Sequence, residues 1–220
     1  MRMGRTNHRA GSMKFVIFGS GGMAKEVIGY VESDGHEVLA VISPEPFADP
    51  DGLWARYTVS EYRLMGRHDC LLAIADPTIK RKVVGENPGL PWATFIHSSC
   101  FISPHARIGR GCIFAPHSLV CGDPVIGDFC FFNTNATIGH DSTLGAYSTL
   151  FPNTEICGDC QIGDGVIFGI GAYALPGVTL PSGSKVSAGA VVRESHDSPV
   201  TLFGDPRGAY RVKLQETSNG

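Results

Sequence analysis

Residues 126–150 read IGDFCFFNTNATIGHDSTLGAYSTL, and every sixth residue of this stretch is apolar. The same register stays apolar in both directions, from residue 96 to residue 192. Because about half of the residues in a globular protein are apolar, chance would give such a run on the order of once in 10⁵ trials. The positions of this register are Ile96, Ile102, Ile108, Phe114, Val120, Ile126, Phe132, Ile138, Leu144, Leu150, Ile156, Ile162, Phe168, Ala174, Leu180, Val186 and Val192.

A second register, four residues after the first, holds mostly small side chains. An inward apolar residue, an inward small residue and a turn in every six residues are typical of the hexapeptide repeat of a parallel β-helix. Three short strands then form a coil of about eighteen residues, and coils stack about 4.8 Å apart. We therefore expect a triangular prism over residues 96–193. The small positions are Cys100, Ala106, Cys112, Ser118, Pro124, Cys130, Ala136, Ser142, Ser148, Thr154, Cys160, Val166, Ala172, Val178, Ser184 and Ala190.

The seven cysteines are predicted to be mostly free thiols. Cys100, Cys112, Cys130 and Cys160 fall on the small inward register, where a thiol behaves as a small apolar group. The motif Cys157-Gly-Asp-Cys160 is similar to a redox or zinc motif, but Cys160 points inward and no second cysteine pair completes a four-ligand site. An odd number of cysteines without a secretion signal favours a reducing compartment, and we expect a cytoplasmic protein.

Composition and charge exclude several classes of protein. The apolar fraction is 43% and the charged fraction is 18%, which is typical of a globular chain. A net charge of −3 argues against a nucleic-acid-binding protein, which usually carries a strongly basic face. No apolar run approaches the roughly 18 residues that a membrane span requires. Residues 1–12 contain no apolar run either, so we interpret them as a disordered extension or a cloning remnant rather than a signal peptide.

Residues 13–95 are predicted to form a small parallel α/β domain, because short apolar runs alternate with helical segments. A glycine-rich turn with the spacing Gly19-x-Gly21-x-x-Ala24 follows the first strand, and such a turn before a helix is typical of phosphate binding. The second strand ends in Ser43-Pro44-Glu45, which supports an NAD ribose contact only weakly. We therefore favour a single nucleotide or its diphosphate, with a ligand-free tight turn as the alternative. The predicted strands are residues 14–18, 37–42 and 70–75, and the predicted helices are residues 25–31 and 77–85.

Five stretches carry a resemblance to a known family in their order and spacing: FGSGGMA (18–24), AIADPTIKR (73–81), IHSSCFISPHARI (96–108), NTNATIGHD (133–141) and GDPRGAYR (204–211). Over residues 13–211 the chain resembles bacterial sugar acetyltransferases. These include the N-acetyltransferases of nucleotide-linked 4-amino-sugars and the sialic acid O-acetyltransferases. The resemblance implies a left-handed β-helix and an acetyl-CoA-dependent enzyme that makes a precursor of cell-surface polysaccharide, such as lipopolysaccharide.

In that family the catalytic base is a histidine on a prism loop that is followed by an acidic residue, and His140-Asp141 matches this pair. The base takes a proton from the amine or hydroxyl that attacks the thioester, and a histidine with a pKa of about 6.5 suits this task. The carboxylate fixes the ring tautomer and stabilises the imidazolium. Without the resemblance, His140 would be interpreted as an ordinary turn histidine.

The resemblance also implies the binding residues and the assembly. The nucleotide-linked sugar is expected in the N-terminal domain and at a prism loop, and acetyl-CoA in the groove between neighbouring prisms of a homotrimer, closed by the tail, residues 194–220. Met23, Asp76 and Lys80 stand where the family commonly has His, Asn and Arg. The expected substrate residues are Gly21, Gly22, Met23, Ser43, Asp76, Asn133 and Thr134, and the expected acetyl-CoA residues are Ser148, Thr149, Gly169, Ile170, Ala188 and Pro206.

Apolar residues at outward positions of the predicted prism favour an assembly of chains, since flat faces that carry them are typical interaction surfaces. These positions are Phe131, Tyr147, Phe151, Ile167 and Tyr173. Packing three prisms about one axis would bury a groove between each neighbouring pair and give a closed cyclic trimer.

Alternatives to an N-acetyltransferase stay open. One alternative is an O-acetyltransferase whose acceptor is a hydroxyl of sialic acid or another sugar. The other is a non-catalytic prism scaffold. A zinc hydratase needs histidines that align on one face, and only His105 and His140 approach the required separation, without a third imidazole. We therefore expect no metal. An NAD oxidoreductase is disfavoured by the missing acidic partner and by the lack of a separate catalytic domain.

Overall fold

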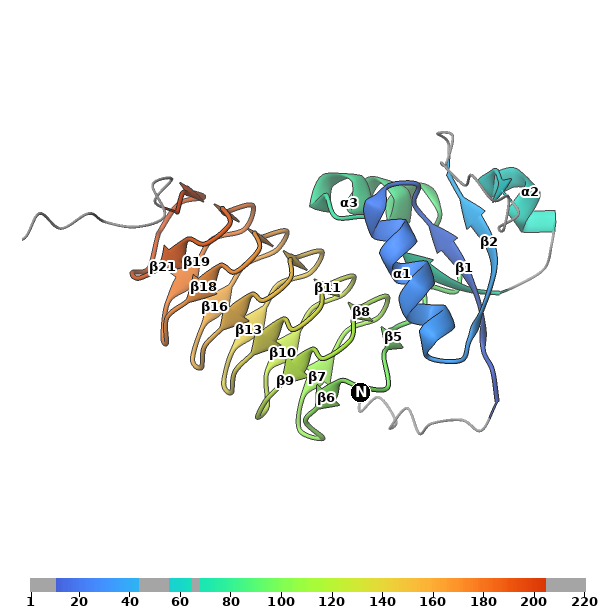
Figure 1. Ribbon diagram of the computed structural model, residues 1–220. Helices are drawn as coiled ribbons and strands as arrows, with labels where there is room; N and C mark the ends of the chain where they lie inside the picture. Colours follow the sequence, from blue (N-terminus) through green and yellow to red (C-terminus); the bar gives the residue numbers. More distant parts are fainter. Residues whose placement is uncertain (1–10, 44–55, 65–67, 205–220) are drawn as a thin grey trace, which may run out of the picture.

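The computed structural model describes residues 11–43, 56–64 and 68–204. The expectations for residues 1–10 and for the tail beyond residue 204, including Pro206, lie outside the described residues. The described chain forms an N-terminal α/β domain and a prism of stacked coils (Figure 1). None of the helices in these ranges has both the length and the apolar character that a membrane crossing requires.

The N-terminal domain contains, in chain order, β1 (Lys14–Phe18), α1 (Gly22–Ser33), β2 (Glu37–Ile42), β3 (Arg56–Tyr57), α2 (Val59–Leu64), β4 (Asp69–Leu72) and α3 (Pro77–Glu86). Its four strands form a parallel sheet in the order β3-β2-β1-β4. The bounds of β1 and β2 coincide with the prediction. The sequence does not predict β3 or α2, because a two-residue strand and a six-residue helix are too short to leave a periodic pattern.

Local chemistry explains where the two longer helices begin. Gly21 is the N-cap of α1 and has an extended backbone with φ −89° and ψ −171°. Asp76 is the N-cap of α3, and one of its carboxylate oxygens accepts the backbone N–H groups of Thr78 and Ile79 at 2.8 and 3.1 Å. Pro77 then takes the first helical position, where an amide hydrogen is not needed.

The prism consists of two-residue strands in three parallel sheets of five, six and seven strands (Figure 1). Its strands are β5 (Phe95–Ile96), β6 (Phe101–Ile102), β7 (Arg107–Ile108), β8 (Ile113–Phe114), β9 (Leu119–Val120), β10 (Val125–Ile126), β11 (Phe131–Phe132), β12 (Thr137–Ile138), β13 (Thr143–Leu144), β14 (Thr149–Leu150), β15 (Glu155–Ile156), β16 (Gln161–Ile162), β17 (Ile167–Phe168), β18 (Tyr173–Ala174), β19 (Thr179–Leu180), β20 (Lys185–Val186), β21 (Val191–Val192) and β22 (Thr201–Leu202). From β5 to β21 paired strands are eighteen residues apart, as in Phe131 opposite Thr149, so each coil has three strands as predicted. The last strand, β22, lies beyond the expected end at residue 193 and pairs with β20.

The two predicted registers fill the interior of the prism. From Phe114 to Val192 every residue of the apolar register is buried, and the three earlier ones are partly buried. The rings of Phe114 and Phe132 stack with centroids 4.7 Å apart, which is the spacing between coils. Four cysteines of the small register lie in this core, and all seven cysteines are free thiols.

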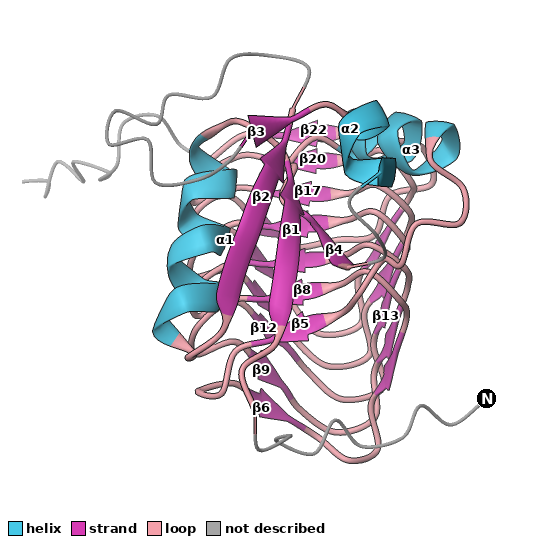
Figure 2. Cartoon of the chain, turned by 90° about the vertical axis from the view of Figure 1, so that its right-hand side faces the viewer, coloured by secondary structure: helices cyan, strands magenta, loops and turns pink. Residues whose placement is uncertain are grey.

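The N-terminal domain packs on the outer face of the seven-stranded sheet (Figure 2). Phe95, Ile113 and Phe131 belong to β5, β8 and β11 of this sheet, and they are buried in one cluster with apolar side chains of β1 and α1. In Figure 2, α1 lies at one side of this sheet and α3 at the other. The two domains therefore share a core, and this core fixes the position of the glycine-rich turn relative to the prism.

Lys80 of α3 is buried at the edge between the five- and seven-stranded sheets, with 1% of its surface exposed. Its ammonium group donates hydrogen bonds to the carbonyl oxygens of Phe129 and Ser148 at 3.1 and 3.2 Å and to Oγ1 of Thr149 at 2.8 Å. The Thr149 hydroxyl in turn donates to the carbonyl oxygen of Ala75 at 2.7 Å. Burial lowers the pKa of Lys80 to about 8, which leaves the group mostly protonated at pH 7.

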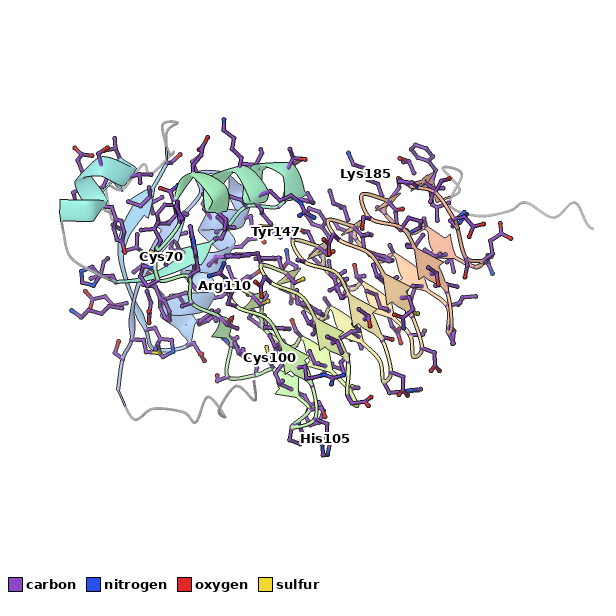
Figure 3. All side chains as sticks on the ribbon, turned by 180° about the vertical axis from the view of Figure 1, so that it is seen from behind. Cys70, Cys100, His105, Arg110, Tyr147 and Lys185 are labelled. Atoms are coloured by element: carbon purple, nitrogen blue, oxygen red, sulfur yellow. The ribbon has the colours of Figure 1, made fainter. Side chains whose placement is uncertain are left out.

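Tyr147 is also covered by α3 (Figure 3). Its ring stacks on Phe129 with centroids 5.2 Å apart, and the Arg81 guanidinium lies 4.5 Å from its centroid. The sequence places Phe131 and Tyr147 on a face between chains, and this prediction is wrong because the N-terminal domain of the same chain covers both. Tyr173, in the six-stranded sheet, is 40% exposed.

Candidate functional site

His140 and Asp141 lie together on an exposed turn between β12 and β13. The Nδ1 atom of the imidazole and Oδ2 of Asp141 are 2.8 Å apart. Asp141 has a left-handed backbone, with φ 54°, and its N–H donates to Oδ1 of Asp123 on the preceding coil at 3.1 Å. Because an ionised carboxylate only accepts hydrogen bonds, Nδ1 carries the hydrogen and Nε2 is the basic atom of the ring.

Carboxylates surround the His140 imidazole. The hydrogen bond to Asp141 raises the pKa of His140 above its ordinary value of 6.5, and the charges of Asp141, Asp159 and Asp123 act in the same direction. Asp123, Asp141 and Asp159 are eighteen residues apart and therefore recur at one edge of the prism on three successive coils. The arrangement favours the imidazolium, which is the state that a base reaches after it accepts a proton.

One group of potential metal ligands also lies in the described part of the chain. Ligand atoms of His140, Asp141 and Asp159 lie within 4.8 Å of one another, and all three side chains are exposed. Exposed carboxylates often gather without an ion, and the group contains a single imidazole. We interpret it as an acid–base group rather than a metal centre.

The glycine-rich turn leaves the backbone of the first turn of α1 accessible to a ligand, because Gly21 and Gly22 have no side chains to cover it. Gly19 has φ 143°, and a Cβ atom there would lie 2.5 Å from the Ala73 carbonyl oxygen, so only glycine fits. Gly21 and Gly22 are exposed, and a Cβ atom on either would meet nothing within 4 Å. The first turn contains no acidic residue, so its backbone N–H groups can receive an anion.

Ser43 and Asp76, the other expected substrate residues of this domain, occupy different settings. Ser43 follows β2 and is half-buried. Asp76 is exposed, but one of its carboxylate oxygens is engaged in capping α3. The capping role of Asp76 was not predicted from the sequence, although Asp before Pro at the start of a helix is a capping signal. Met23 lies in the first turn of α1 and packs on the core between the domains.

Asn133 and Thr134, on the turn between β11 and β12, contact helix α1. The Tyr30 hydroxyl lies 3.2 Å from both Oδ1 of Asn133 and Oγ1 of Thr134. The Asn133 Nδ2 atom donates to Oε2 of Glu26 at 3.1 Å. Burial raises the pKa of Tyr30. Glu26 and Tyr30 are one helical turn apart, and this spacing is the only sequence signal that could have indicated a polar contact between α1 and the prism.

The expected acetyl-CoA residues divide into two groups. The side chains of Ser148 and Thr149 are fully buried and are hydrogen-bonded within the chain, so neither is accessible to a ligand. Ile170 is 56% exposed, and Ala188 is exposed on the next coil. Gly169 packs under Ala188, because a Cβ atom on it would lie 2.5 Å from the Ala188 nitrogen.

The expected site residues of the prism lie at different edges of the triangle. Asn133–Thr134, Gly169–Ile170 and Ala188 lie on turns between the seven- and six-stranded sheets, which we call the α1 edge. His140 lies between the six- and five-stranded sheets, which we call the His140 edge. This edge is opposite the seven-stranded sheet and its N-terminal domain. The structure thus places Asn133–Thr134, Gly169–Ile170 and Ala188 of one chain on one edge of the prism and His140, the expected base, on another.

No family model and no curated protein sequence matches the chain. Solved structures do. PerB from Caulobacter crescentus, in complex with CoA and GDP-perosamine, is 30% identical, and the match covers 90% of this chain and 96% of PerB with a TM-score of 0.76. The chain belongs to the hexapeptide-repeat sugar acetyltransferases. Within this family, perosamine N-acetyltransferase from C. crescentus has also been solved with a histidine replaced by asparagine, and that structure matches at 29% identity with a TM-score of 0.79.

A third solved structure supports the fold alone. The acetyltransferase domain of PglB from Neisseria gonorrhoeae is 24% identical, and the match covers 89% of this chain and 98% of that domain with a TM-score of 0.79. The chain therefore has the family architecture of a parallel α/β domain followed by a parallel β-helix, as the sequence predicts.

Proposed function

We propose that this protein transfers the acetyl group of acetyl-CoA to the amino group of a nucleotide-linked amino-sugar, with His140 as the general base. The observation that carries the proposal is the 2.8 Å contact between His140 and Asp141 on an exposed turn. The relative in complex with CoA and GDP-perosamine supports the ligand classes.

The mechanism is a direct attack. The sugar amine attacks the thioester carbonyl carbon while Nε2 of His140 takes a proton from the nitrogen. The carbon–sulfur bond then breaks, and CoA leaves as the thiol with the proton that the imidazolium returns. Ser142 is not available as a nucleophile, since its hydroxyl donates to the carbonyl oxygens of His140 and Cys157. Burial raises the pKa of Cys157, which disfavours its thiolate.

We further propose that the active site forms between copies of this chain in a homotrimer. The His140 edge lies opposite the N-terminal domain, whereas Asn133, Ile170 and Ala188 lie on the α1 edge. A second copy that places its His140 edge against the α1 edge would join the base to both substrates.

Turnover tests the proposal. Wild-type protein is incubated with acetyl-CoA and a panel of nucleotide-linked amino-sugars, and thiol release is followed together with the mass of the product. A mass gain on the amine supports the proposal. Acetylation of a hydroxyl alone would make the protein an O-acetyltransferase, and an absence of turnover across amines and hydroxyls would contradict acetyl transfer to sugars.

The Gly21→Val variant is expected to raise the KM for the nucleotide-sugar by about tenfold or more while the KM for acetyl-CoA stays unchanged. The extended backbone of Gly21 suits valine, and a Cβ atom there meets nothing within 4 Å, so a selective rise in the KM for the nucleotide-sugar would report on the ligand. Gly29→Val on the same helix serves as the matched control, because a Cβ atom at Gly29 also meets nothing within 4 Å outside the helix's own backbone. Equal effects on both substrates would show that the turn has only a structural role.

The Asp141→Asn variant is expected to move the acidic limb of the kcat/KM profile to lower pH. A base must be neutral, so activity is lost as the pH falls through the pKa of His140, which the Asp141 carboxylate raises. Without that charge the pKa returns toward 6.5 and the loss occurs at lower pH. Asp159→Asn should produce a smaller shift in the same direction. Unchanged limbs in both variants, measured with one substrate, would contradict this electrostatic role.

A further inference from the structure

His140 lies between two glycines, one on each neighbouring coil. Gly122 and Gly158 precede and follow it by eighteen residues and occupy the same position of the coil. A Cβ atom on Gly158 would lie 2.6 Å from both Cε1 and Nε2 of the imidazole. A Cβ atom on Gly122 would lie 2.5 Å from the Cβ atom of His140. The ring therefore rests directly on the backbone of Gly158.

The turn itself does not require glycine at position 158. Gly122 has φ 75°, a conformation that favours glycine, whereas Gly158 is outside the left-handed region. The same position two coils away from His140 holds Pro104 on one side and Pro176 on the other. The coil thus accepts side chains at this position, and the His140 ring is the group that a side chain at 158 would displace.

We propose that Gly158 is a positioning residue for the base, because its missing side chain leaves the space in which the His140 imidazole lies beside Asp141. A methyl group at 158 would push away the ring, which is the flexible partner in this contact. The rotation would break the 2.8 Å contact with Asp141 and move Nε2. The consequence for catalysis rests on the proposed function, whereas the contact between ring and glycine does not.

Gly158→Ala tests the proposal by two readouts. The first is the imidazole titration of His140, followed by NMR and assigned by comparison with His140→Gln. We expect the midpoint to fall toward the ordinary value of 6.5, since the carboxylate that raises the pKa no longer contacts the ring. The second is kcat, which we expect to fall by about 10- to 100-fold, as for a base displaced by about 1 Å.

Two controls separate positioning from folding. Gly183→Ala introduces a methyl group into open space at another turn of the prism, where φ is 78°, so it strains the backbone without approaching His140. It should lower the stability and leave the His140 titration and kcat unchanged. In a double-mutant cycle, Gly158→Ala should add no further loss when His140 is already alanine, because both changes act through one group.

An unchanged His140 titration in Gly158→Ala would overturn the proposal, as would an equal loss of rate in the presence and absence of His140. The titration needs no substrate. If the wild-type protein acetylates no sugar, the proposed function fails while the NMR result still decides whether Gly158 positions the ring.

Discussion

Replacing His140 with alanine is expected to lower kcat by roughly 10²–10⁴, while acetyl-CoA still binds. The variant loses the proton acceptor and little else, because the side chain is 63% exposed and packs on a glycine. Steady-state rates and a binding titration with acetyl-CoA measure the two halves of this expectation.

His105→Ala is the matched control, since His105 is also exposed and lies on a turn between the six- and five-stranded sheets. It should retain wild-type turnover. Loss of activity in both variants would indicate a shared site for two imidazoles, and wild-type turnover by the His140 variant would refute the assignment of the base.

Replacing Lys80 with methionine is expected to destabilise the protein by about 2–4 kcal/mol. Methionine fills a similar volume but donates no hydrogen bond, so the carbonyl oxygens of Phe129 and Ser148 would lose a buried donor. The Thr149 hydroxyl would lose the same partner. Urea unfolding at pH 7 measures the change.

Lys82→Met on the same helix provides the comparison. Its side chain is 71% exposed, and its pair with Glu86 at 3.9 Å is a surface contact of little energetic value. We expect a change within about 0.5 kcal/mol. Equal stabilities for the two variants would show that the three acceptors at Lys80 find other partners.

The fold could be predicted largely because the same six-residue sequence pattern recurs along the whole prism. A six-residue register that continues from Ile96 to Val192 specifies strand, turn and core together. A single small, weakly apolar residue such as Ala174 does not interrupt it. In the N-terminal domain, β1 and β2 are short apolar runs with clear ends. The two-residue strand β3 offers no such signal, because its pairing with β2 depends on tertiary contacts.

The candidate site could be predicted only where adjacent residues carry the chemistry. His140 and Asp141 are neighbours in sequence, so their contact follows from the turn. Asp76 and Thr149 were predicted to contact ligands, yet one carboxylate oxygen of Asp76 caps α3 and the Thr149 hydroxyl is bonded to Lys80. Such roles depend on how the domains pack. The separation of the edges was accessible to arithmetic, since residues that differ by multiples of eighteen lie on one edge.

The periodic coil also gives the α1 edge a fixed unit of length. Asn133–Thr134 and Gly169–Ile170 lie two coils apart, which at about 4.8 Å per coil is a separation of about 10 Å. The His140 turn depends only on its own coil and on the coils of Asp123 and Gly158. Duplication of one eighteen-residue unit after Asp159 would therefore increase this separation by one coil in a single step. The distance between positions on the α1 edge can in this way change in discrete steps during evolution, while the His140 turn stays unchanged.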